Sequence, residues 1–147
     1  MTDDYEVFVA KLEGKYPEMF AGQYGGVCIN KGWWPILEAL CGQITSHLKH
    51  RNGLASQYPD QHKPVAQVVV DQIKEKFGGL RFYYTGGDDT IYGMVRMAES
   101  WANQSCEECG SPGHKTQESW VKTLCDFHIA EQEALRAEQM RRDGFEE

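Results

Sequence analysis

Three cysteines and one histidine near the C-terminal end, spaced C-x2-C-x15-C-x2-H, constrain the fold of this chain more than any other feature. They are Cys106, Cys109, Cys125 and His128. A tetrahedral zinc ion takes sulfur and nitrogen ligands, and a gap of two residues lets both members of a pair reach the same ion. Because four protein ligands leave no position for water, we expect a structural zinc ion, Zn2+, and not a catalytic one.

The residues around these ligands predict the elements that hold them. Gly110 directly follows the second cysteine, and a positive φ there lets backbone amides of the turn point at the sulfurs. Residues 118–124 predict a short strand with Trp120 turned inward and Leu124 as a second inward candidate. Residues 126–142 are rich in Glu, Ala, Leu and Arg and predict a helix whose start carries the last two ligands.

This order of cysteine knuckle, short ribbon and ligand-bearing helix resembles the treble-clef class of zinc fingers over residues 105–140. The resemblance implies that the metal holds the fold of a small C-terminal lobe. Two alternatives stay open. His114 can replace His128 as the fourth ligand, although it stands alone in a glycine-rich turn, and the cysteines can be ordinary buried thiols.

The first two thirds of the chain predict an α+β fold in which helices pack on a small antiparallel sheet. Apolar residues at helical spacing indicate helices over residues 4–12, 35–50 and 89–102, with Asn52-Gly53 closing the second. Residues 65–70 and 80–85 predict strands of a hairpin through Gly78-Gly79, while residues 71–77 fit either a strand or a helical turn. With 147 residues, 41% of them hydrophobic, we expect one α+β core over residues 1–104 and a zinc lobe over residues 105–147.

The chain has no apolar run of the roughly 20 residues that cross a bilayer, and its first residues lack the basic and apolar layout of a signal peptide. Three of its five cysteines belong to the metal pattern. We therefore expect a cytoplasmic protein without membrane contact. Cys28 and Cys41 remain, and we expect them to be buried free thiols, with a disulfide as the alternative.

Residues 72–84 contain the run KFGGLRFY and are followed downstream by C-x2-C-G. Together these residues are similar to segments of small uncharacterised phage and prophage proteins. The resemblance implies a phage-encoded protein that acts on host machinery, and it implies no activity.

Charge separates the two parts of the chain. The net charge is −7, and residues 105–147 hold 10 acidic and 5 basic side chains, against 12 and 10 in residues 1–104. A module that grips phosphates needs a basic face, so the finger itself is a poor DNA reader.

The centre of the chain is basic instead. Residues 49–81 hold six basic side chains against three acidic ones. Lys74, Lys76 and Arg81, with Tyr83 on the same strand face as Arg81, can form a patch for nucleic acid or an acidic protein. The alternative is an ordinary solvated strand face.

No catalytic motif is complete. The sequence contains no G-x-S-x-G, Walker-type glycine loop or H-E-x-x-H, and Asp88-Asp89 is typical of a helix start. We therefore expect no enzyme. The predicted function is a non-catalytic, zinc-stabilised binding protein that inhibits or regulates a host protein, for example one involved in defence, through its acidic C-terminal helix. The alternative is a nucleic-acid-binding accessory protein that uses Lys74, Lys76 and Arg81.

Overall fold

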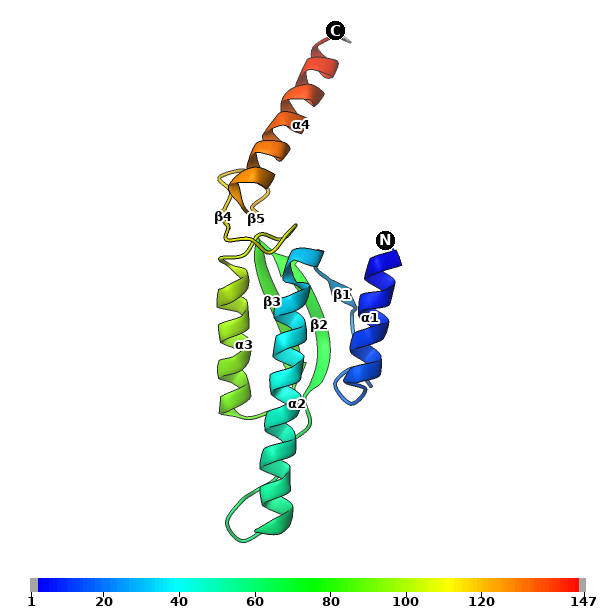
Figure 1. Ribbon diagram of the computed structural model, residues 1–147, viewed down its shortest axis with the longest axis vertical. Coiled ribbons are helices and arrows are strands. Elements are labelled where there is room, and N and C mark those ends of the chain that lie inside the picture. The colour runs from blue at the N-terminus through cyan, green and yellow to red at the C-terminus, as the bar shows by residue number, and fades with distance from the viewer. Residues whose placement is uncertain (1–2, 146–147) are drawn as a thin grey trace.

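A computed structural model describes residues 3–145 of the chain. The order of elements, shown in Figure 1, is α1 (Asp3–Lys15), β1 (Val27–Cys28), the 3-10 helix η1 (Lys31–Trp33), α2 (Trp34–Gln57), β2 (Val69–Lys76), β3 (Gly79–Thr85), α3 (Asp89–Ala102), β4 (His114–Lys115), β5 (Thr123–Leu124) and α4 (Asp126–Phe145). The α+β class predicted from the sequence is confirmed.

The main sheet has three strands in the order β1-β2-β3. Strands β2 and β3 form the expected antiparallel hairpin, in which Lys76 pairs with Gly79 across the turn. Strand β1 adds a parallel pair, Val27 with Ile73, so the sheet is mixed. Two residues are too few to show a period of two, which is why the sequence indicated no parallel partner for β2.

One face of this sheet packs into the main hydrophobic core. The buried residues of the hairpin are Val70, Ile73, Leu80 and Phe82, and a bulge between Val70 and Gln72 lets Val70 and Ile73 point to the same side. Helices α2 and α3 pack against each other, and α3 packs against β3 (Figure 1). The opposite face carries half-buried and exposed side chains, and we call it the open face: Gln72, Lys74, Lys76, Arg81 and Tyr83.

Helix α2 is longer than predicted. Asn52-Gly53 does not close it, and the helix continues to Gln57. The Asn52 amide is engaged elsewhere, since its Oδ1 accepts from the Val65 amide at 2.7 Å and its Nδ2 donates to the Val65 carbonyl at 3.1 Å. Asn52 therefore binds the returning chain within the last two turns of α2.

The strand boundaries also differ from expectation. Residues 65–68 lie outside any strand, and β2 begins only at Val69. Residues 71–76, which also fitted a helical turn, are strand because β2 has hydrogen-bonded neighbours on both sides. Pairing with distant residues thus decides a segment whose local pattern is ambiguous.

Within residues 3–145, no helix combines the length and the apolar character needed to cross a membrane.

Candidate metal centre

The four predicted ligands converge at the start of α4. Cys106 and Cys109 lie in the turn that follows α3, Cys125 directly precedes α4, and His128 lies in its first turn. Their three sulfurs and one ring nitrogen all lie within 4.8 Å of one another. Ligands from the two pairs, 16 to 22 positions apart in the sequence, therefore meet at one point.

The distances between ligand atoms fit a tetrahedral ion. Cys109 Sγ and Cys125 Sγ are 3.8 Å apart, and Cys106 Sγ is 3.5 Å from His128 Nδ1. Bonds of about 2.3 Å to sulfur and about 2.0–2.1 Å to nitrogen at tetrahedral angles require separations of about 3.8 Å and about 3.5 Å. Cys125 Sγ lies somewhat closer to His128 Nδ1, at 3.2 Å. All four ligand atoms lie within 4.8 Å of one another, so the cluster can hold a metal ion once its wider separations close to these values.

Hydrogen bonds prepare Cys109 to act as a thiolate. The hydroxyl and the amide of Ser111 both bond to its sulfur and lower the pKa of Cys109 to about 6. Gly110 makes this turn possible with a φ of +81°, and its amide donates to the Cys106 carbonyl at 2.8 Å. The positive φ expected at Gly110 is therefore present in the structure.

The other two thiols sit in different surroundings. Burial raises the pKa of Cys106, while backbone amides of Cys125, Glu108 and Cys109 oppose the shift. The His128 amide hydrogen bond lowers the pKa of Cys125. Amides aimed at sulfurs favour the thiolates that a metal requires.

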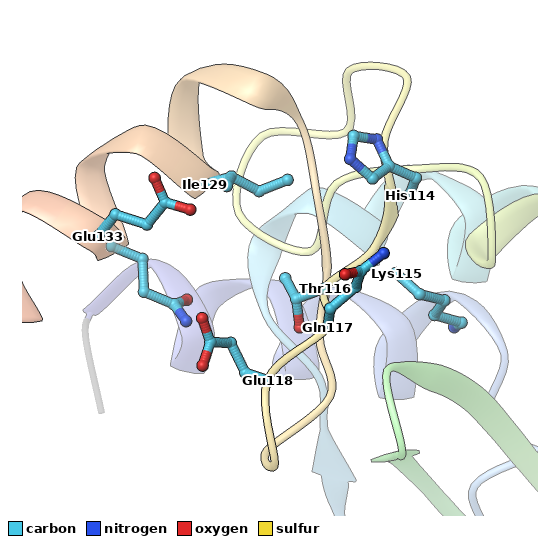
Figure 2. A pocket seen from close by; sticks show the side chains of 8 residues that line it. His114, Lys115, Thr116, Gln117, Glu118, Ile129 and Glu133 are labelled. Carbon is cyan, nitrogen blue, oxygen red and sulfur yellow. The ribbon is translucent and has the colours of Figure 1, made fainter.

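His114, the alternative fourth ligand, lies outside the cluster. Its side chain is 64% exposed, and its Nε2 is 3.9 Å from Asp126 Oδ1. It lines a pocket of about 320 Å³ between the loop 114–118 and α4, where Glu118 and Glu133 lie on the two sides (Figure 2). The structure therefore groups His128, and not His114, with the three cysteines.

The predicted inward position of Trp120 is wrong. Strand β5 covers only Thr123–Leu124, and Leu124 is 2% exposed whereas Trp120 is 73% exposed. Two hydrogen bonds between Thr116 and Lys122 close a loop, which carries Trp120 away from the ribbon. Trp101, at an apolar position of the helix predicted over residues 89–102, is likewise 52% exposed.

The metal cluster sits directly against the core. Trp33, fully buried, donates from Nε1 to the Ser105 carbonyl at 2.8 Å. The Gly32 amide donates to the Glu107 carbonyl, also at 2.8 Å. The cluster has only a small apolar core of its own, formed by Cys106, Leu124 and Cys125 with Ile129 packed on it.

A lysine that sequence reasoning missed joins three elements at this contact. Lys115 Nζ donates to Asn103 Oδ1 at 2.8 Å, to Thr123 Oγ1 at 2.9 Å and to the Gly78 carbonyl. It thereby links β4 to the end of α3, to β5 and to the turn between β2 and β3. No local motif marks such a lysine, because its partners lie 8 to 37 residues away.

Only some of the basic residues predicted to bind nucleic acid or an acidic protein lie together. Lys74 and Arg81 are direct cross-strand partners, and Lys74 Nζ lies 5.8 Å from the centre of the Tyr83 ring. Lys76 lies at the end of β2, beside the turn. Lys49 and Arg51 belong to the end of α2 that lies farthest from β4 and β5 (Figure 1), so the central basic residues do not form one patch.

Cys28 and Cys41 are both free thiols. Cys41 is buried as expected, and burial raises its pKa to about 12. Cys28 is exposed, in contrast to the expectation, because it ends β1 on the side away from the core.

Fold and site together define an α+β protein with a Cys3His cluster able to hold a metal ion. Comparison with protein-family models, with curated proteins and with solved structures finds no match. The treble-clef and phage resemblances therefore stay predictions.

Proposed function

We propose that the metal is zinc and that the chain is a non-catalytic, zinc-stabilised binding protein with a treble-clef-like lobe. Three thiolates and one imidazole at tetrahedral separations are a ligand set that suits zinc. All four positions come from the protein, which favours a structural role. Since the lobe buries so few apolar side chains, metal binding supplies much of its folding free energy.

The observation that carries the binding role is helix α4. Over 20 residues it has no buried side chain among those described, and it extends away from the rest of the molecule (Figure 1). Its direction is held at its base by the ligands Cys125 and His128 and by an ion pair of 2.6 Å between Arg136 and Glu118. Ile129 packs on the small apolar core of the cluster near the start of α4, but the later turns of the helix carry no buried side chain among the described residues and are free to bind a partner.

The chemistry of α4 favours a basic protein as the partner. Its acidic side chains within the described residues are Asp126, Glu131, Glu133, Glu138 and Asp143. Complementary charge steers association and selects partners. The phage-like segment leads us to propose a host protein as this partner, which the chain inhibits or regulates, in the cytoplasm.

Co-purification from a bacterial lysate tests this function, with the zinc-loaded chain as bait. Glu131→Lys, Glu133→Lys and Glu138→Lys together should abolish retention of the partner. The matched control reverses three exposed acidic residues elsewhere, Glu6, Glu18 and Asp60, and should retain it. Equal retention by both variants, with metal content unchanged, contradicts a role for α4.

Binding of nucleic acid by an accessory protein is the second candidate. The specific observation in its favour is the open face, where Lys74, Arg81 and Tyr83 lie together without a helix covering them. A salt-sensitive gel shift that disappears on changing Lys74, Lys76 and Arg81 to Glu is expected.

A further inference from the structure

Phe77 occupies a backbone conformation that suits few side chains. Among residues 3–145, Phe77 is the one non-glycine residue with a positive φ, at +53°. Gly78 follows with a φ of +73°. A two-residue hairpin turn with two positive φ values normally takes Asn, Asp or Gly at its first position. The Phe77 ring is 71% exposed, so it does not contribute to the core either. Lys76 Nζ lies 5.7 Å from the centre of the ring. Strain at an exposed aromatic residue outside the core points to function.

A second exposed aromatic residue faces the same space. Trp120, in the loop between β4 and β5, lines a pocket of about 240 Å³ together with Phe77. The other residues that line it are Glu75, Lys76, Ser119 and Val121. One wall of this pocket thus comes from the hairpin turn and the other from the lobe.

Contacts of Gly78 with the lobe connect the two walls. Thr123 Oγ1 donates to the Gly78 carbonyl at 2.6 Å. A Cβ atom on Gly78 would lie 3.0 Å from the carbonyl carbon of Lys122, so the backbones of turn and lobe are in contact. These contacts hold the end of the loop that carries Trp120 against the turn that carries Phe77.

The surroundings of the pocket favour an anionic ligand. Lys76 lines it, and Lys74 and Arg81 follow on the open face. Three nearby carboxylates are engaged within the protein. Glu75 Oε2 accepts from the Gly78 amide at 2.7 Å, and Glu107 Oε2 accepts from the Thr123 amide at 2.7 Å. Glu118 pairs with Arg136. Cations next to exposed aromatic rings are the combination that binds single-stranded nucleic acids, where bases stack on rings and phosphates meet Lys and Arg.

We propose that Phe77 and Trp120 form a stacking site for an unpaired base of a single-stranded nucleic acid. This inference rests on the second candidate function and names its ligand. The bound nucleic acid continues from the pocket over Lys74 and Arg81. There the ring of Tyr83, a residue that is 42% exposed, can stack on a second base. A duplex keeps its bases stacked inside, so it reaches the lysines and not the pocket.

Fluorescence anisotropy with a labelled oligo-dT 12-mer and a duplex of the same length tests the site. Phe77→Asn removes the ring and suits the turn better, so the variant stays folded. It should weaken single-strand binding about 10-fold, and so should Trp120→Ala. Trp101→Ala is the matched control, because it removes another exposed tryptophan, on α3, and should leave affinity unchanged. Duplex affinity should change with none of these variants.

The outcomes distinguish failure of the stacking site from failure of nucleic-acid binding as a whole. Single-strand binding that needs Lys74 and Arg81 but survives Phe77→Asn and Trp120→Ala overturns the stacking site and leaves the basic patch. Absence of any binding by the unchanged protein at low salt overturns both. If poly-glutamate binds as tightly as oligo-dT and Phe77→Asn weakens both equally, the ligand is an acidic peptide and not a nucleic acid. That result also overturns the proposal.

Discussion

The amide of Gly32 donates a 2.8 Å hydrogen bond to the carbonyl of Glu107, the residue that follows the first metal ligand. Gly32 lies in η1, directly before α2, and a Cβ atom there would lie 2.2 Å from the Cys106 carbonyl oxygen. The backbone of the core and the backbone of the metal turn are therefore in contact at a position where no side chain fits. This contact couples the stability of the core to that of the metal centre.

Gly32→Ala should destabilise the protein by about 2 kcal/mol, because the new methyl group overlaps backbone atoms that must move. Urea denaturation followed by circular dichroism measures the loss. The same variant should release its metal to a chelating dye at a lower dye concentration than the unchanged protein. Metal retention equal to that of the unchanged protein would show that the two parts are not coupled here.

Gly53→Ala is the matched substitution, and it should stabilise the protein where Gly32→Ala destabilises it. Gly53 lies inside α2, and no atom approaches the position of its Cβ within 4 Å. Replacing glycine by alanine in a helix interior reduces the entropy of the unfolded chain, so the unfolding free energy should rise by about 0.5–1 kcal/mol. A lower denaturation midpoint would show that α2 does not run through this position.

Asp88 should contribute to stability as the N-cap of α3. Its Oδ1 accepts from the Ile91 amide at 3.0 Å, and its Oδ2 lies 2.8 Å from His47 Nε2. Asp88→Ala should cost about 1 kcal/mol in thermal or urea denaturation. Asp60→Ala, in the exposed loop after α2, is the control and should change stability little.

The pKa of Asp88 makes the stability of the fold depend on pH. Burial alone would raise the pKa of Asp88, but the hydrogen bonds from His47 and Ile91 outweigh it and lower the pKa below its ordinary value of 3.8. A lowered pKa stabilises the folded state above the ordinary value, and this stabilisation disappears as the pH falls below about 3.8. Stability measured from pH 6 to pH 3 should therefore fall less steeply in Asp88→Asn.

Thiol labelling should report metal occupancy. With the metal bound, Cys28 is the exposed thiol outside the cluster, so one of the five cysteines should react quickly with a thiol reagent. Chelation should make Cys106, Cys109 and Cys125 reactive as well. Cys41 should react only after denaturation, because it is buried and its pKa is raised to about 12. Labelling counted by mass spectrometry checks each step, and protection unchanged by a chelator would contradict metal binding.

Lys115→Met should loosen the contact between core and lobe. The variant keeps much of the aliphatic stem but removes the hydrogen bonds to Gly78, Asn103 and Thr123. We expect a cost of about 1–3 kcal/mol, since acceptors at this contact lose their donor. Hydrogen exchange should show faster exchange in β4 and β5 than in the core helices. Lys122→Met, on the same ribbon, is the control.

Much of the fold is readable from local patterns. The cap residue Asp88, the apolar spacing of α3 and the paired glycines 78 and 79 each predict an element that the structure contains. The end of α2 was misjudged because the Asn52 side chain binds Val65, a residue 13 positions away. Trp120 was misjudged because an alternating pattern does not reveal that Thr116 and Lys122 close a loop around it.

The four candidate metal ligands and the class of the fold can be read from the chain alone, because ligand spacing and helical period are properties of neighbouring residues. Three relations appear only in the packed molecule: the turn after Cys106 lies on Gly32, Lys115 links β4 to three other segments, and Phe77 and Trp120 line one pocket. These relations join residues between 8 and 75 positions apart. No local period encodes them, because they arise when separately formed elements pack and exclude water from the surfaces between them.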